Sequence, residues 1–363
     1  MANQDHTRAA WAALLAVFCA HVFAVLITEA PRIVRVDLKT PVLAAAGGAS
    51  TKTTLATMPG KKTGTNRPTA DTAVPDVDDG ETVTTPRDRV VADDKLAAYQ
   101  GLGSWVDLFN RGPWRDPSGT VRKMHRRGVR TIYLQTSTYG SPAHIVHPRK
   151  VGAFIASAHA RGMFVIGWSV PSFVDPDKDF RRAAAAIRFR TKKGEAFDSF
   201  GLDIEADIVK NIGLRNYRLM QISRGLRRVA GKDYPLGAII PDPHSLYWPD
   251  FPYKRVAAVY DVIVPMGYFT FSARGYKDVR RYTEKNIRAI RRGTGDRRTP
   301  IHVIGGIADD VGVAAARGFI KAIKKHRALG ASLYDFPITS KKTWKELKSV
   351  PAAPRSPARP ARP

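Results

Sequence analysis

Three acidic residues at alternate positions, Asp203, Glu205 and Asp207, have the types and spacing to do chemistry. If the surrounding stretch 197–207 is a β-strand, these acids share one face with Gly201, and the apolar residues take the other face. Carboxylates at alternate strand positions lie about 6–7 Å apart and raise one another's pKa, so folds keep them mainly where they transfer protons or bind a cation. A strand end with solvated acids is the alternative interpretation.

Strand-like and helix-like segments alternate through residues 95–350, which is the pattern of a parallel α/β fold. The predicted strands are Gly103–Phe109, Thr131–Thr136, Met163–Ser169, Ser199–Glu205, Leu236–Ile240, Val262–Met266, His302–Gly305 and Ser332–Phe336. The predicted helices include His147–Arg161, Phe180–Lys192, Asn216–Val229, Tyr276–Arg291 and Val311–Leu329, and the glycines expected to end helices are Gly128, Gly162, Gly231 and Gly330. Eight such units over about 250 residues predict a (β/α)8 TIM barrel. An open doubly wound sheet is the alternative, although no glycine-rich nucleotide turn follows the first strand.

In a TIM barrel, functional side chains follow the carboxyl ends of the strands. The residues that we expect there to bind a substrate are Asp107, Gln135, Trp168, Asp207, Asp242, Trp248, Met266, Tyr334 and Asp335. Acids surrounded by aromatic rings suit a sugar, whose C–H faces stack on rings while its hydroxyls bond to carboxylates. Each has a structural alternative: the tryptophans as packing at the rim, Asp242 as a turn former, and Asp107 and Asp335 as helix caps.

Two motifs resemble the catalytic signatures of TIM-barrel glycoside hydrolases related to the chitinase-like family 18. They are Gly201-Leu202-Asp203-Ile204-Glu205 on the fourth predicted strand and Tyr260-Asp261-Val262-Ile263-Val264-Pro265-Met266-Gly267-Tyr268 on the sixth. The Asp-x-Glu also resembles the family 25 lysozymes. The resemblance implies that Glu205 is the general acid, that Asp203 orients or stabilises, and that Tyr268 lies near the reacting carbon.

The chain departs from the full chitinase signature, Asp-x-x-Asp-x-Asp-x-Glu. Aligned on the glycine, Asp207 stands at the position of the acid and Glu205 at that of the middle aspartate. We prefer Glu205 as the acid, because it is expected at the strand end, where its position is fixed, while Asp207 is expected to begin the loop.

Glycoside cleavage requires a protonated carboxylic acid at the glycosidic oxygen, so the pKa of Glu205 should be raised towards neutrality. Asp203 would keep Glu205 protonated or hold an acetamido group of the substrate as an internal nucleophile. Without that group a second carboxylate must act, and Asp107, Asp242 and Asp335 are the candidates.

The net charge and the pattern of histidines bear on two other function classes, nucleic-acid binding and metal-dependent hydrolysis. A net charge of +27 indicates an anionic neighbourhood such as a cell-wall polymer, but the basic residues are spread over predicted helices without a nucleic-acid-binding module. A metal-dependent hydrolase would need Asp203, Glu205 and His244 or His302, yet no His-x-His or His-Glu-x-x-His pattern occurs. We therefore predict no metal, no cofactor and no specific nucleic acid.

The ends of the chain predict a tethered protein. Residues 1–30 contain the apolar run Ala9–Thr28, read as an uncleaved membrane-spanning signal-anchor, with secretion as the outcome if it is cleaved. Residues 31–94 form a low-complexity, disordered linker, residues 95–350 the barrel, and 351–363 a basic Pro/Arg-rich tail. The sequence thus predicts a single-pass cell-membrane protein whose extracellular barrel cleaves an envelope or extracellular polysaccharide. A non-catalytic glycan-binding barrel at the cell surface is the alternative.

Overall fold

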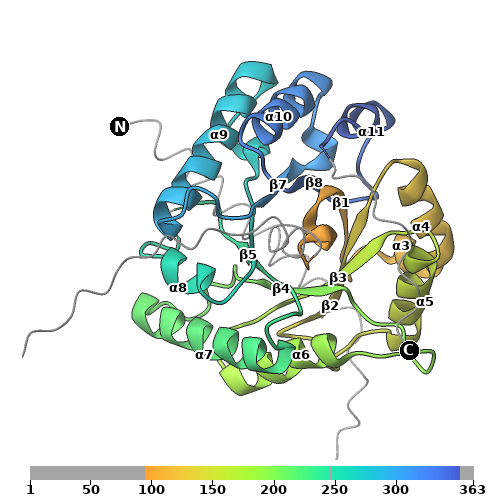
Figure 1. Ribbon diagram of the computed structural model, residues 1–363, viewed down its shortest axis with the longest axis vertical. Coiled ribbons are helices and arrows are strands. Elements are labelled where there is room, and N and C mark those ends of the chain that lie inside the picture. The colour runs from red at the N-terminus through yellow and green to blue at the C-terminus, as the bar shows by residue number, and fades with distance from the viewer. Residues whose placement is uncertain (1–94, 246, 352–363) are drawn as a thin grey trace, which may run out of the picture. The chain divides into compact units, whose positions relative to one another are not determined.

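The computed structural model describes residues 95–245 and 247–351, and in this part of the chain eight parallel strands alternate with helices (Figure 1). The strands are β1 (Gly101–Val106), β2 (Thr131–Thr138), β3 (Phe164–Val170), β4 (Ser199–Asp203), β5 (Leu236–Ile240), β6 (Val262–Pro265), β7 (His302–Ile307) and β8 (Gly330–Tyr334). They pair in the order β6-β5-β4-β3-β2-β1-β8-β7. Parallel bridges from Ile263 to Ile301 and from Met266 to Ile304 link β6 to β7, so the sheet closes into a (β/α)8 barrel.

The helices surround the strands (Figure 1). They are α3 (Arg111–Arg115), α4 (Pro117–Arg126), α5 (Pro148–His159), α6 (Pro176–Arg188), α7 (Ile212–Ala230), α8 (Tyr253–Ala257), α9 (Gly275–Thr294), α10 (Val313–Lys325) and α11 (Lys341–Leu347), with single 3-10 turns η1 (Ala97–Tyr99), η2 (Phe269–Phe271) and η3 (Ala308–Asp310). Local chemistry starts several of them: the Asp116, Asp175 and Asn211 side chains accept backbone N–H groups in the first turns of α4, α6 and α7.

Alternate residues of each strand enter two separate cores. On β4, Phe200 and Leu202 pack outward against the helices, whereas Gly201 faces inward, where an added Cβ would meet Ile239 at 3.0 Å. The inner core contains Trp105, Tyr133, Ile166, Trp168, Ile239, Val262, Val264, Met266 and Ile304. Burial on both faces explains why the strands read as nearly continuous apolar runs.

We call the end of the barrel where the strands begin the base, and the end where they finish the mouth. At the base, η1 lies across the opening, because the Tyr99 hydroxyl is 2.6 Å from the Ser199 Oγ, at the start of β4. Gly237 leaves room for this ring, since an added Cβ there would lie 2.5 Å from the tyrosine oxygen. His302 Nδ1 lies 2.9 Å from the Tyr99 carbonyl oxygen. The base is therefore filled and hydrogen-bonded.

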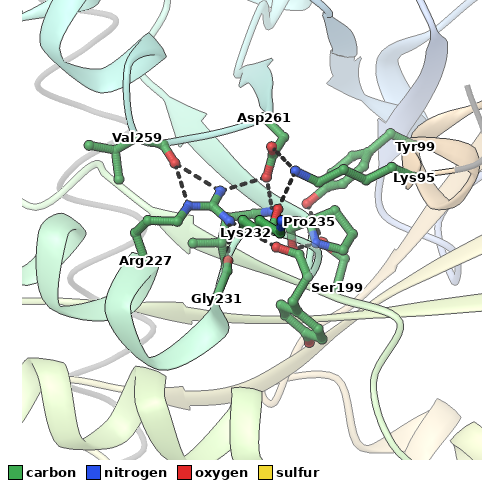
Figure 2. A network of polar contacts seen from close by, with 11 residues as sticks. Lys95, Tyr99, Ser199, Arg227, Gly231, Lys232, Pro235, Val259 and Asp261 are labelled. Atoms are coloured by element: carbon green, nitrogen blue, oxygen red, sulfur yellow. Dashed lines mark hydrogen bonds and ion pairs between the residues drawn. The ribbon is translucent and has the colours of Figure 1, made fainter. Parts of the chain in front are cut away.

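An ionic network completes the base (Figure 2). The carboxylate of Asp261 accepts hydrogen bonds from Lys95 Nζ at 2.6 Å, from Arg227 Nη2 at 2.6 Å and from the Leu236 backbone N–H at 2.8 Å. Lys95 also donates to the Lys232 carbonyl at 2.7 Å, which fastens the residues before β1 to the loop before β5.

The barrel prediction is confirmed for the described residues, but several predicted bounds were wrong. Strand β1 ends at Val106 rather than Phe109, β4 at Asp203 rather than Glu205, β6 at Pro265 rather than Met266, and β8 at Tyr334 rather than Phe336. Helix α10 ends at Lys325, and Gly330 begins β8 instead of ending a helix, because an added Cβ there would meet the Gly101 carbonyl oxygen at 2.3 Å. The predicted signal-anchor, the linker and nearly all of the basic tail lie outside the described residues. Among the helices of the described part, none is long and apolar enough to cross a membrane.

Candidate active site

Asp203 and Glu205 stand at the mouth, at the end of β4. The Ile204 backbone N–H donates to the Ile239 carbonyl at 2.8 Å, so the pairing with β5 holds the backbone between the two acids. Asp203 is buried, and its Oδ1 has no hydrogen-bond partner among the described residues. Glu205 is half-buried and follows the last paired residue. The predicted facing of the strand is thus confirmed for Gly201 and Asp203, which point inward, and for Leu202, which points outward.

The surroundings favour the neutral forms of both acids. Burial and the charge of Glu205 raise the pKa of Asp203 well above its usual range. Burial raises the pKa of Glu205 to about 7. A carboxylic acid that holds its proton near neutrality can donate it to a leaving group.

Two tyrosines lie close to this acidic pair. The pKa values of Tyr268, just after β6, and Tyr247, in the loop after β5, are raised by burial and then by the charges of Glu205 and Asp203. Met266 lies beneath Tyr268, buried in the inner core, with its N–H donating to the Ile240 carbonyl at 2.9 Å. The structure therefore brings all three predicted catalytic residues into one electrostatic neighbourhood.

A second carboxyl pair, Asp107 and Asp335, lies on the other side of the mouth, after β1 and β8. Asp107 is fixed by three hydrogen bonds, from the backbone N–H groups of Phe109 and Asn110 and from the Tyr334 hydroxyl, each at 2.8 Å. Burial, followed by the charge and the hydrogen bond of Asp107, raises the pKa of Asp335 to about 8. Because β4 and β8 are four strands apart in both directions around the barrel, the two acidic pairs face each other.

A series of aromatic rings links the two walls. The ring centroids of Tyr268 and Tyr334 are 6.5 Å apart, those of Tyr334 and Trp105 are 6.3 Å apart, and those of Trp105 and Trp168 are 5.5 Å apart. Trp105 also stacks on Tyr133 at 4.2 Å. The Trp168 Nε1–H is buried without a hydrogen-bond acceptor in the described residues. A polar ligand in the mouth could supply one.

Four predicted binding residues have structural partners. The Asp242 carboxylate accepts from the Tyr282 hydroxyl and, at 3.3 Å, from Asn286 Nδ2, both on α9. Trp248 is buried in the outer core, where the Arg215 guanidinium lies 4.0 Å from its ring centroid. Gln135 and Asp207 also have partners. Gln135 Oε1 accepts the Leu108 N–H at 2.8 Å, and Asp207 forms an ion pair with Lys210 at 2.7 Å.

Trp105 and Tyr247 belong to the site but are absent from the predicted set. Strand alternation could have predicted the position of Trp105, because Trp105 shares a face with Asp107 on the first predicted strand. Tyr247 carries the same signal as its neighbour Trp248, because both aromatic residues follow the fifth predicted strand.

The described residues contain no group of three or more histidine, cysteine or acidic side chains that could hold a metal ion. His302 lies at the base, 3.1 Å from Ser332 Oγ, and thus at the opposite end of the barrel from Asp203 and Glu205. His244 follows Asp242, whose carboxylate contacts α9. Neither histidine joins the acidic pair as the metal-dependent alternative requires.

No family model and no curated protein matches the sequence. Solved structures do match. A chitinase from Bacteroides thetaiotaomicron has a TM-score of 0.52 at 12% identity, covering 69% of this chain and 95% of its own. A plant class V chitinase mutant from Cycas revoluta, in complex with (GlcNAc)3, has a TM-score of 0.51 at 10% identity, covering 68% and 98%. The endo-1,4-beta-mannanase from Rhizomucor miehei has a TM-score of 0.50 at 8% identity, covering 65% and 86%. The chain therefore shares the TIM-barrel fold of chitinases and a mannanase.

Proposed function

We propose that the protein is a glycoside hydrolase. The observation that carries the proposal is the pair of acidic walls at the mouth, one with a carboxyl group whose pKa is raised to about 7. Glycoside hydrolysis commonly uses two carboxyl groups that flank the scissile bond, one protonated and one ionised. The shared fold with chitinases and a mannanase supports the same assignment, as an analogy at the level of architecture.

Glu205 is the general acid in this proposal and protonates the glycosidic oxygen as the bond breaks. Asp203, directly beneath it, shares a proton with Glu205 and orients the sugar. Asp335 is the carboxyl group on the opposite wall that acts on the sugar carbon or on water, because Asp107 is fixed by three hydrogen bonds and Asp242 contacts α9. Tyr268 lies midway between the walls and directs its hydroxyl to the reacting sugar.

The Glu205→Gln variant tests this assignment, because it keeps the shape of the side chain and removes the proton. We expect the full-length protein to release reducing ends from one of a panel of purified bacterial polysaccharides, and the variant to lose about 10²–10⁴-fold of that rate while still binding the polymer. Glu346→Gln is the matched control, since Glu346 pairs with Arg317 on the outer surface.

Binding without cleavage by both proteins would contradict the hydrolase and support a glycan-binding barrel. Cleavage with an unchanged rate in Glu205→Gln but a lost rate in Asp207→Asn would instead move the acid to Asp207. The anomer of the first product, followed by NMR, would separate retention from inversion.

We also propose that residues 1–30 hold the barrel at the outer face of a cell membrane, or direct its secretion. The apolar run Ala9–Thr28, of about the length that spans a bilayer, supports this location. Protease added to intact cells should degrade the barrel of the full chain but spare a chain that lacks residues 1–30. Protection of both would contradict an exterior location.

A further inference from the structure

The four acids that face each other across the mouth have no basic partner. In the described residues, no lysine, arginine or histidine nitrogen comes within 4.0 Å of a carboxylate oxygen of Asp107, Asp203, Glu205 or Asp335. Burial raises the pKa of Tyr247, which lies close to the acidic pair, and the charge of Arg215 opposes this rise. The Arg215 guanidinium itself stacks on Trp248 and donates to the Tyr247 carbonyl at 2.9 Å, so it does not pair with the acids.

This lack of partners does not follow from the composition. The chain has 59 lysines and arginines against 32 aspartates and glutamates, so bases are abundant. Elsewhere in the described residues, basic side chains form ion pairs with acids. Asp261 pairs with Lys95 and Arg227. Glu284 pairs with Arg280, Arg288 and Lys325. Unpaired acids at the mouth are therefore a local property of this part of the protein, and a cation placed among them would meet no competing basic side chain of the described residues.

Two further observations indicate a ligand there. Asp203 Oδ1 is an acceptor without a hydrogen-bond partner among the described residues, in a side chain that is buried. The rings of Trp105, Trp168, Tyr268 and Tyr334 form a connected series between the strands that carry the acidic pairs, and those of Tyr268 and Tyr334 are partly exposed. Aromatic faces attract cations through their quadrupoles, and the attraction is stronger where the cation is desolvated. Acids and rings together form the kind of surface that binds an ammonium group attached to an apolar body.

A positive charge beside Asp335 would also favour the catalytic roles proposed above. Asp335 must lose its proton to act on the sugar carbon or on water, yet burial and Asp107 raise its pKa to about 8. A cation bound beside Asp335 would favour its ionised form. No basic side chain in the described residues is placed to do this.

We propose that the substrate is a glycan whose hexosamine residues carry free amino groups, with an ammonium group seated beside Asp335 and its neighbours. This inference rests on the proposed glycosidase and names its substrate class. It also separates two surfaces: the outer basic residues suit an anionic polymer, whereas the mouth suits a cationic sugar. The net charge of +27 repels a polycation at long range, so selective binding of amino sugars must arise at the mouth.

The test uses β-1,4- and β-1,6-linked oligomers of N-acetylglucosamine, each before and after chemical deacetylation. They are titrated into the full-length protein by calorimetry, and reducing ends are counted in the same samples. We expect one deacetylated series to bind at least tenfold more tightly than its acetylated parent. Equal or tighter binding of the acetylated forms, or no binding of any deacetylated form, would overturn the inference.

Two variants locate the effect. Asp335→Asn removes the carboxyl group that would pair with the ammonium group, and we expect it to lower affinity for the deacetylated series at least fivefold more than affinity for the acetylated series. Asp233→Asn removes an exposed charge from the loop after α7, at the base, and should change neither. If Asp335→Asn unfolds, Asp203→Asn takes its place, since an amide fills the same volume. Equal effects of the mouth and base variants would contradict the proposed location.

The two hypotheses fail in different ways. Tight, selective binding of amino sugars without release of reducing ends would leave the substrate class standing and remove the hydrolase. Release of reducing ends from acetylated oligomers alone would leave the hydrolase standing and remove the substrate class.

Discussion

The two ends of the barrel differ in whether the protein itself compensates the charge of a carboxyl group. At the base, Asp261 meets two cations and a backbone N–H, so its negative charge is compensated by the protein itself (Figure 2). At the mouth, Asp203 is buried and its pKa is raised, and within residues 95–245 and 247–351 its Oδ1 has no hydrogen-bond partner. Compensated acids fasten loops together, whereas uncompensated acids are costly to keep and are retained where a ligand completes them. The contrast therefore separates the end of the fold that its ion pairs stabilise from the end where the proposed active site lies.

The sharpest test of this contrast is Asp203→Asn. We expect activity to fall about 10²–10³-fold, because an amide cannot share a proton with Glu205 as the coupled carboxyl group can. Stability should stay within about 0.5 kcal/mol, since a buried acid that is already neutral is replaced by a group of equal size. Kinetics and denaturant unfolding measure the two quantities. A large loss of stability with unchanged activity would place Asp203 among the structural acids.

Asp261→Asn should give the reverse pattern. The change leaves Lys95 and Arg227 without their carboxylate, so we expect a loss of about 2–4 kcal/mol in the free energy of unfolding. Activity of the folded fraction should be unchanged, because the residue lies at the base. Urea unfolding beside a rate measured well below the melting temperature separates these effects. A rate that falls with little loss of stability would break the distinction between the two ends.

The pH dependence of activity and of stability should reflect the titration of Glu205 at the mouth. Since the pKa of Glu205 is about 7, activity should decline as pH rises through 7, approaching tenfold per unit above it. Stability should also fall between about pH 4 and 7, because the unfolded chain loses this proton at lower pH than the folded protein. Rates and melting temperatures across pH 5–9 check both, and Glu205→Gln should flatten this part of the stability profile. A rate that rises steadily through pH 8 would exclude Glu205 as the acid.

The smallest effect concerns His159, a compensated group near the start of β4. Burial lowers its pKa, but hydrogen bonds and charges from Asp198 and Glu195 outweigh this and raise it to about 9. Its stabilising contribution is full below about pH 6.5 and disappears as pH rises through 9. We expect His159→Gln to cost about 0.5–1 kcal/mol at pH 6 and almost nothing at pH 10, because the pair is partly exposed. An equal cost at both pH values would point to packing.

The sequence predicted the parts of the fold that strand and helix periodicity controls. Leu236–Ile240 was predicted with the bounds that the structure has, and the alternation from Gly201 to Asp203 placed the acid on the inner face. Gly128, Gly162 and Gly231 have φ of +85°, +61° and +71°, as expected for residues that end helices. Helix and strand ends were less accurate, since tertiary contacts such as that between Gly330 and Gly101 decide them.

The site was harder to predict, because the loops depend on partners far along the chain. Asp242 contacts Asn286, 44 residues later, and Trp248 donates to Asn216, 32 residues earlier. Neither contact is visible from strand position, which placed both residues among the candidates for binding. The roles of Glu205, Asp203 and Tyr268 in catalysis stay predictions that the variants above address.

The turn η1 has a practical consequence for handling the protein. Because Lys95 and Tyr99 contact the loops before β5 and β6 and the start of β4, the described chain enters the barrel at the end opposite its acids. Immobilisation on a bead through a tag placed just before Lys95 would therefore leave the mouth open to the medium. A tag inserted after Asp335 would instead stand at the entrance and obstruct large polymers before small ones.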